Sequence, residues 1–408
     1  MDDKLLWVWL TERMHRSSRT ITELMSIFDD VGEIYAKTDF KDIDFLTPAQ
    51  RSALENKSLD EANKILEKIK MTGADILVYS SPDYPDMLRK TDEPPYVLYI
   101  KGEIMKWDRL MPIAVVGTRS CTDYGLNAAW AICTGLARSG ITIVSGMARG
   151  LDSVAAAAAI KAGCKTIAVL GCGLDIVYPP ENDRLMEAVT KHGAVITEYP
   201  PSTPPRGSHF PVRNRIISGL SRGTLVIQAP LHSGALITAN YALDSGKDVF
   251  AVPGDINSPQ SRGTNMLIKT GAKLVESSAD ILCEYRAEIE LLKSEITRGK
   301  SADLDFEYEP APSDNGGGGK NKTEKKSGAA KKKTVNNEKN ISIDDERYSG
   351  LDDDEKSIIA QLIKSNMHID DIKRNTDITI EKLTTKLTVL EMRGFIVQMP
   401  GKLFRINI

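Results

Sequence analysis

Cysteine is scarce in this sequence, and the few cysteines that occur form no recognisable metal or disulfide framework. The chain has 408 residues and five cysteines, scattered through apolar segments without a CxxC pair or a Cys/His cluster. Structural zinc sites and disulfide-stapled domains need close, regular ligand spacing, so we expect neither. Free thiols buried in a reducing compartment fit the pattern better, which favours a cytoplasmic protein without a bound metal.

Excess positive charge and long apolar runs are missing as well. The formal net charge is −3 at pH 7, so a nucleic-acid site would have to be a local patch. The first residues, MDDKLLWVWL, lack a basic start and a cleavage site, and no apolar run approaches the length of a membrane helix. We therefore expect a soluble, cytoplasmic protein with no membrane partner.

The residue sets that would indicate a cofactor or a catalytic centre are also absent. The first glycine turn reads VVGTRSCTDYG, so Gly117 is followed by Thr118 and Arg119 and does not complete a GxGxxG fingerprint. The next strand ends in Ser145 and Gly146, without the acidic residue that binds a ribose. No carboxylate pair, Ser/His/Asp set or Walker lysine accompanies these turns. We predict no cofactor and no catalytic residues.

From residue 112 onward, apolar runs alternate regularly with helical stretches. Near-continuous apolar, β-branched runs are typical of strands buried on both faces of a parallel sheet. Most of them end in glycine, at the sheet edge where such folds bind ligands. The predicted strands are 113–117, 141–146, 165–171, 194–199, 224–229 and 248–254, with an earlier strand over 96–100. This order predicts an α/β fold with a Rossmann-like, doubly wound, mostly parallel sheet.

Composition divides the chain into four parts. Residues 1–75 have the apolar spacing of a small helical domain, and 80–296 hold the α/β domain. Residues 298–345 are rich in Lys and Gly and predict a flexible linker. Residues 346–408 form the last domain.

The last domain has the pattern of a winged helix, because three helical segments precede the hairpin sequence GFIVQMPGKLFRINI. Its third helix carries Lys382, Lys386 and Arg393. Basic residues on that helix suit duplex DNA, and they equally suit a module that contacts only proteins. The sequence favours neither.

Glycine-rich turns at the carboxyl edge of the sheet indicate anion binding. Backbone amides at a helix start bind phosphate, and arginines in two of the turns add positive charge. The predicted contacts in these turns are Gly117, Thr118, Arg119, Ser145, Gly146, Arg149, Gly171, Ser233 and Gly234. We expect Asp152 to cap the alanine-rich helix, and Tyr178 either to stack on a base or to pack against prolines.

An aromatic residue among arginines marks the segment GSHFPVRNRIISGLSRGTLVIQA. Phe210 stands close to Arg206, Arg213 and Arg215, and Asn214 lies between the last two. Guanidinium groups bind phosphates and an aromatic ring stacks on bases, as at sites for single-stranded nucleic acid. We predict that these residues form one wall of a DNA-binding pocket whose floor is made by the glycine turns.

Over about residues 80–280 the sequence resembles the DprA/Smf family (DNA-processing protein A). The resemblance rests on VVGTRSCTDYG, IVSGMARGLDSVAAAAAI, TIAVLGCGLDIVYPPEN, ITEYPPSTPPRGSHFPVRNRIISGLS and VIQAPLHSGALITANYALDSGKDVFAVPGDINSPQSRGTN, in this order. It implies an extended Rossmann-fold domain that binds single-stranded DNA without catalysis. It also implies a sterile-alpha-motif-like (SAM-like) helical domain before it and a winged helix after it.

The resemblance further implies partners and contacts. Such a protein would form a homodimer, protect incoming DNA, load RecA recombinase during natural transformation and displace single-strand-binding protein. Where the family has a basic residue in its YPxxN turn, this chain has Pro180-Glu181. The family contacts map onto Arg119, Arg206, Phe210, Arg213 and Arg215.

The alternative function is that of a Rossmann-like hydrolase that cleaves the base from nucleoside monophosphates. Such enzymes resemble this chain in their SGxxxG turns but use a PGGxGTxxE signature. The corresponding segment here reads HSGALITA, with no glutamate at that place. The missing carboxylate weighs against hydrolysis.

Overall fold

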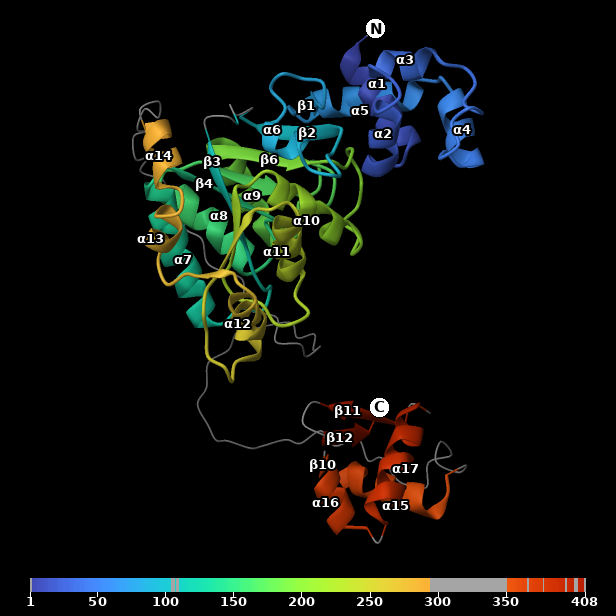
Figure 1. Ribbon diagram of the computed structural model, residues 1–408, viewed down its shortest axis with the longest axis vertical. Helices are drawn as coiled ribbons and strands as arrows, with labels where there is room; N and C mark the ends of the chain where they lie inside the picture. The colour runs from blue at the N-terminus through green and yellow to red at the C-terminus, as the bar shows by residue number, and fades with distance from the viewer. Residues whose placement is uncertain are drawn as a thin grey trace, which may run out of the picture. The chain divides into compact units, whose positions relative to one another are not determined.

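The computed structural model describes residues 2–103, 107, 110–293, 351–364, 367–376, 378–392, 395–399 and 403–406 (Figure 1). The chain separates into two compact units, Met1–Gly319 and Lys320–Ile408. The linker predicted over 298–345 lies outside the described residues. Of the helices in the described part of the chain, none combines the length and the apolarity needed to cross a bilayer.

A nine-stranded sheet forms the centre of the first unit, in the order β1-β2-β6-β5-β4-β3-β7-β8-β9. Strands β1 and β2 join antiparallel, and all neighbours from β6 to β9 in this order pair in parallel. The strands are β1 (Asp75–Val78), β2 (Val97–Gly102), β3 (Met111–Val116), β4 (Ile141–Ser145), β5 (Thr166–Val169), β6 (Gly193–Thr197), β7 (Gly223–Val226), β8 (Asp248–Ala251) and β9 (Lys273–Leu274). The predicted doubly wound, mostly parallel sheet is confirmed, and β1 and β9 extend it beyond the predicted strands.

Helices cover both faces of this sheet (Figure 1). One face packs against α7, α8 and α9, and the other packs against α10, α11 and α12. Along β2, Val97 and Tyr99 enter one core while Leu98 and Ile100 enter the other, because successive strand side chains point to opposite faces. The helices are α6 (Asp86–Arg89), α7 (Asp123–Arg138), α8 (Leu151–Lys161), α9 (Asp183–His192), α10 (His209–Gly219), α11 (Gly234–Asp244), α12 (Arg262–Lys269), α13 (Ser278–Leu282) and α14 (Arg286–Lys293).

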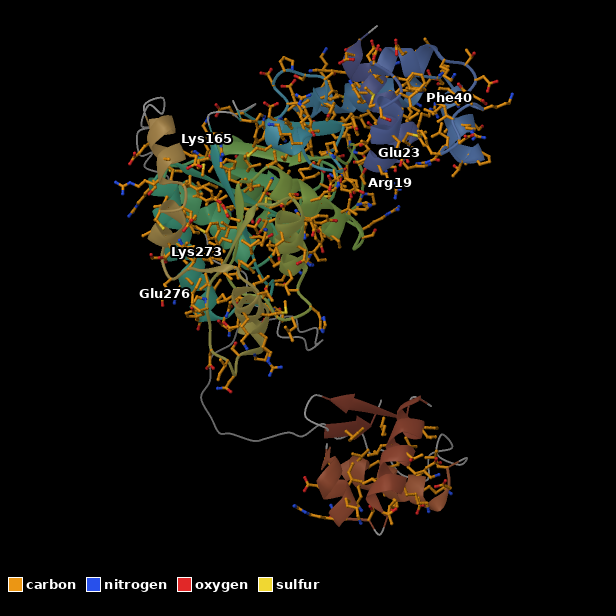
Figure 2. All side chains as sticks on the ribbon, in the orientation of Figure 1. Arg19, Glu23, Phe40, Lys165, Lys273 and Glu276 are labelled. Atoms are coloured by element: carbon orange, nitrogen blue, oxygen red, sulfur yellow. The ribbon has the colours of Figure 1, made fainter. Side chains whose placement is uncertain are left out.

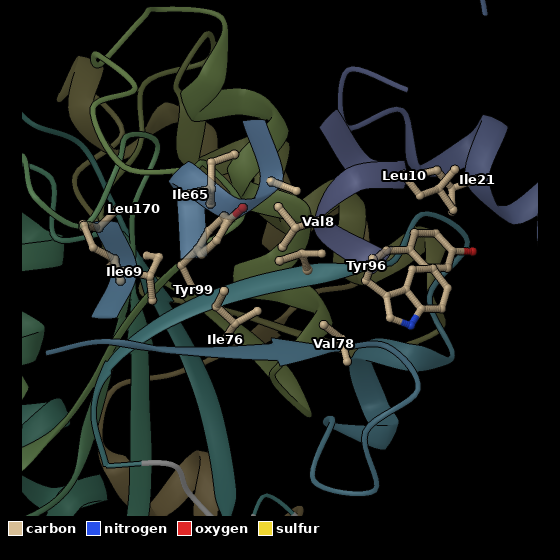
Figure 3. Close-up of a cluster of buried hydrophobic side chains, with 14 of the residues drawn as sticks. Val8, Leu10, Ile21, Ile65, Ile69, Ile76, Val78, Tyr96, Tyr99 and Leu170 are labelled. Atoms are coloured by element: carbon tan, nitrogen blue, oxygen red, sulfur yellow. The ribbon is translucent and has the colours of Figure 1, made fainter. Parts of the chain in front are cut away.

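The N-terminal helices pack on the edge of the sheet that β1 and β2 form. Their apolar side chains join those of β1, β2 and β5 in one continuous core (Figure 3). Trp7 stacks on Tyr96 with ring centroids 5.3 Å apart, and the Tyr96 hydroxyl bonds to Oγ1 of Thr22 at 2.9 Å. The helices are α1 (Asp3–Arg13), α2 (Ser18–Met25), α3 (Val31–Ala36), α4 (Pro48–Glu55) and α5 (Asp60–Met71). The division at residue 75 and the SAM-like class stay predictions.

The second unit is a winged helix, as predicted. Helices α15 (Asp353–Lys364), α16 (Ile369–Arg374) and α17 (Ile380–Met392) enclose a core with strands β11 (Ile396–Met399) and β12 (Leu403–Ile406). The two-residue strand β10 (Met367–His368) completes a sheet in the order β10-β12-β11.

The lysines of α17 are not free cations. Lys382 pairs with Asp354 at 2.6 Å, and Lys386 pairs with Glu355, both in the first turn of α15, and with Asp352, which immediately precedes that helix. Arg393, the third basic residue predicted for this face, lies outside the described residues. The pairing reduces the positive potential that this helix could offer to duplex DNA.

Several charged side chains on the surface of the first unit form ion pairs, among them three that Figure 2 labels, Arg19, Glu23 and Lys165. Arg19 pairs with Glu23 one turn away on α2, and Lys165 pairs with Glu103 at 2.6 Å. Such pairing reduces the positive potential of the arginines and lysines involved.

Candidate nucleic-acid interface

A cavity of about 500 Å³ opens at the carboxyl ends of β3 and β7. The strand order reverses between these two neighbours, and crevices at such points bind ligands in doubly wound sheets. A much smaller cavity of about 20 Å³ lies beside it and shares Arg119, Tyr178 and Phe210 in its lining. We refer to the two together as the crevice. The predicted residues that line it are Gly117, Thr118, Arg119, Gly146, Arg149, Gly171, Phe210, Arg213, Asn214, Ser233 and Gly234.

Two stacked aromatic rings and an exposed guanidinium form the centre of the crevice. Phe210, in the first turn of α10, stacks on Tyr178 with ring centroids 5.3 Å apart and planes 29° apart. The guanidinium carbon of Arg119 lies 5.3 Å from the Phe210 centroid, and the Arg119 side chain is exposed. The sequence left the role of Tyr178 open, and the structure places it against Phe210 at the wall of both cavities.

Arg213 lies in the floor of the crevice and not on its rim. Its side chain is buried, at 3% exposure. Its Nη1 donates to the carbonyl of Gly146 at 2.8 Å and to that of Val169, and its Nε donates to Oδ1 of Asn214 at 3.2 Å. Burial lowers the pKa of Arg213 to about 10, so it remains a cation at neutral pH. Arg213 links α10 to the carboxyl ends of β4 and β5, and its charge adds positive potential to the floor of the crevice.

Arg215 and Ser145 do not belong to the crevice, and their prediction as contacts is corrected. Arg215 forms a buried ion pair with Glu198 at 2.5 Å and donates to Oγ of Ser18 on α2 at 3.3 Å. Ser145 is fully buried and donates to the carbonyl of Val115 at 2.7 Å. Residues two positions apart on a helix point about 200° apart, so α10 cannot direct both Arg213 and Arg215 at one site.

Arg206 and the start of α11 complete the rim. Arg206 is exposed between Pro205 and Gly207, which both line the larger cavity. Ser233 caps α11 by accepting from the amide of Ala235 at 3.3 Å. The N-terminal amides and the dipole of α11 face the crevice, and the first turn of this helix has no acidic residue of its own.

Three of the four glycine turns owe their glycine to close packing. A Cβ on Gly146 would lie 2.5 Å from Nη2 of Arg213, and one on Gly171 would lie 3.0 Å from Cδ1 of Phe210. At Gly117 a Cβ would overlap the side chain of the residue that begins α8. Only at Gly234 would an added Cβ meet nothing within 4 Å.

The amide of Gly117 already has an anionic partner. It donates to Oδ1 of Asp152 at 3.3 Å. We expected Asp152 to cap α8, but Gly150 is the N-cap of that helix and no side chain caps it. Burial raises the pKa of Asp152 to about 6. Asp152 is the one carboxylate among the described residues that line the larger cavity.

Thr238 belongs to the crevice but was not among the predicted contacts. It lines the larger cavity one helical turn after Gly234, and its buried Oγ1 has no hydrogen-bond partner among the described residues. The signal was available in the sequence, because residues i and i+4 of a helix lie on the same face. Arg149 lines the smaller cavity, where its Nε and Nη2 donate to the carboxylate of Glu181.

Comparison with known proteins identifies relatives of the α/β domain and of the winged helix. Residues 75–286 match the family model for DNA recombination-mediator protein A, and residues 345–402 match the DprA winged helix domain. The DNA processing protein DprA of Bacillus subtilis is 42% identical over 221 residues, which cover 54% of this chain and 74% of that protein. Protein Smf of a Synechocystis species is 34% identical over 344 residues, which cover 83% of this chain and 81% of that protein.

A solved structure supports the same relationship. The X-ray structure of DNA processing protein A from Streptococcus pneumoniae superposes with a TM-score of 0.62 at 32% sequence identity. The match covers 70% of this chain and 99% of that one. The motifs, the fold and these comparisons agree, and the chain belongs to the DNA recombination-mediator protein A (DprA/Smf) family.

Proposed function

We propose that this protein binds single-stranded DNA in the crevice and acts as a recombination mediator without catalysing a reaction. The observation that carries the proposal is the exposed guanidinium of Arg119 over Phe210, which is itself stacked on Tyr178, at the edge of a cavity of about 500 Å³. Binders of single strands combine a cation for the phosphate with an aromatic surface for the base.

Single strands suit this arrangement better than duplexes, because their bases are free to leave the stack and meet an aromatic ring. The amides at the start of α11 offer a further site for phosphate. These groups recognise parts common to all nucleotides. Binding is therefore expected to tolerate different sequences and to weaken as salt is added.

The finer parts of the function are proposed from family membership. We infer that the protein works in the cytoplasm as a homodimer, protects incoming DNA during natural transformation and loads RecA recombinase onto it, displacing single-strand-binding protein. The description of the matched family as a recombination mediator supports this proposal. Light scattering would test the dimer, and strand exchange by RecA on DNA coated with single-strand-binding protein would test the loading.

Direct titration tests the core of the proposal. Fluorescence anisotropy of the full chain with a labelled oligothymidine, and with a duplex of equal length at the same salt, should show clear preference for the single strand. Equal affinity for both would contradict the proposal. Release of free base from a nucleoside monophosphate would support the hydrolase instead.

A further inference from the structure

The crevice contains a second arginine at its surface, and this arginine is already paired with a carboxylate. Arg149 lines the smaller cavity together with Arg119, Tyr178 and Phe210. Its Nη2 donates to Oε2 of Glu181 at 3.2 Å, and its Nε donates to Oε1 of the same carboxylate. The two side chains are 44% and 32% exposed, so the forked pair lies at the rim, within reach of a ligand.

The backbone positions of both partners are fixed by a buried amide. Glu181 lies in the short 3-10 helix Pro180–Asn182. The side chain of Asn182 is buried and donates to the carbonyl of Met147 at 2.9 Å and to Oγ of Ser153 at 2.8 Å. This ties the turn that carries Glu181 to the loop that carries Arg149. An ion pair between anchored backbones loses less conformational entropy than one between two mobile surface side chains.

Both partners of the pair are charged at neutral pH. Hydrogen bonding from Arg149 holds the pKa of Glu181 below its ordinary value of 4.5. A phosphate approaching the rim finds Arg119 without an ion-pair partner among the described residues, whereas at Arg149 the Nε–Nη2 edge already holds a carboxylate.

We propose that Glu181 is an internal competitor for DNA phosphate at Arg149, and that it sets the affinity and the salt dependence of the crevice. The inference rests on the proposed binding of single-stranded DNA. When DNA binds, a backbone phosphate replaces the Glu181 carboxylate at the Nε–Nη2 edge of Arg149, because a guanidinium binds two oxygens of either anion through a parallel pair of N–H groups. Part of the favourable phosphate contact is thus offset by the ion pair that is lost.

Removing the competitor should strengthen binding. Glu181→Gln keeps the size of the side chain but removes its charge, so phosphate no longer competes with a carboxylate at the Nε–Nη2 edge of Arg149. We expect about fivefold tighter binding of oligothymidine, the scale of one exposed ion pair. The plot of log affinity against log salt should become steeper by about 0.7, the contribution of one further phosphate contact to a single strand.

The test uses anisotropy titrations of the full chain with labelled oligothymidine over a salt series. Glu187→Gln is the matched control, because Glu187 is an exposed glutamate paired with Lys191 on the neighbouring helix α9 and changes the net charge equally. The double variant Arg149→Ala/Glu181→Gln shows whether the gain passes through Arg149. We expect a gain for Glu181→Gln alone, and none for the control or the double variant.

Three outcomes overturn the inference: no gain for Glu181→Gln, an equal gain for Glu187→Gln, or a gain that persists without Arg149. The last two would mean that only net charge matters. These failures are distinct from failure of the proposed function, in which the unaltered chain itself does not bind the single strand. Thermal melting of each variant confirms that the turn anchored by Asn182 remains folded.

Discussion

Replacing Phe210 with alanine removes the ring around which the crevice is built. The ring lies 5.3 Å from Tyr178, and the guanidinium carbon of Arg119 lies 5.3 Å from its centroid. Stacking of one base on an aromatic side chain contributes about 1–3 kcal/mol to single-strand binding. At 1.4 kcal/mol per factor of ten, Phe210→Ala should weaken binding by about 5- to 150-fold. Loss of the cation–π contact also leaves Arg119 less ordered, which moves the effect toward the upper value.

Anisotropy titration with oligothymidine measures this change. Val212→Ala is the matched control on the same helix, because Val212 is 43% exposed and does not line either cavity. Phe210→Trp keeps a flat ring and should retain most of the affinity. The reasoning is refuted if Phe210→Ala binds as tightly as the unaltered chain, or if Val212→Ala weakens binding to the same extent while both variants melt normally.

Further variants distinguish residues that contact DNA from residues that stabilise the fold. Arg119→Ala should weaken binding to all sequences and reduce the slope of log affinity against log salt by about 0.7. Arg215→Ala should instead lower the free energy of unfolding by about 3–5 kcal/mol in denaturant titrations, because the buried carboxylate of Glu198 loses its partner. Because burial raises the pKa of Asp152 from 3.8 to about 6, its contribution to stability should rise as pH falls from about 6 toward 4. Asp152→Asn should abolish that part of the pH dependence of unfolding. Gly146→Ala should lower the melting temperature, and Gly234→Ala should leave it unchanged, because only the first Cβ meets a side chain.

The sheet was predictable because burial on both faces leaves a strong signal. All six residues of β3 and all five of β4 are buried, so their sequences are apolar throughout or nearly so. The edge strands β1 and β9 were not predicted. Strand β1 has four residues and is separated from the end of helix α5 by three residues, and β9 has two residues, so neither shows a period from which a strand could be inferred.

The crevice was predictable only in part. Arg119 follows the end of β3 and Phe210 lies at the start of α10, so the order of strands and helices was enough to place both at the carboxyl edge of the sheet. The same reasoning failed for Arg215, because adjacency in sequence was taken as adjacency in space without the helical rotation between residues 213 and 215. The pairing of Arg149 with Glu181 joins two turns that are 32 residues apart, and no local pattern reveals such a contact.

Photo-crosslinking locates the bound DNA most directly. A single strand that carries 5-iodouracil is bound to the full chain and irradiated, and the attached peptide is identified by mass spectrometry. We expect the crosslinks at Phe210 or Tyr178, because the halogenated base couples to the aromatic ring on which it stacks, and we expect Arg119→Ala to reduce their yield. Crosslinks confined to the winged helix, with none in the crevice, would contradict the proposed site.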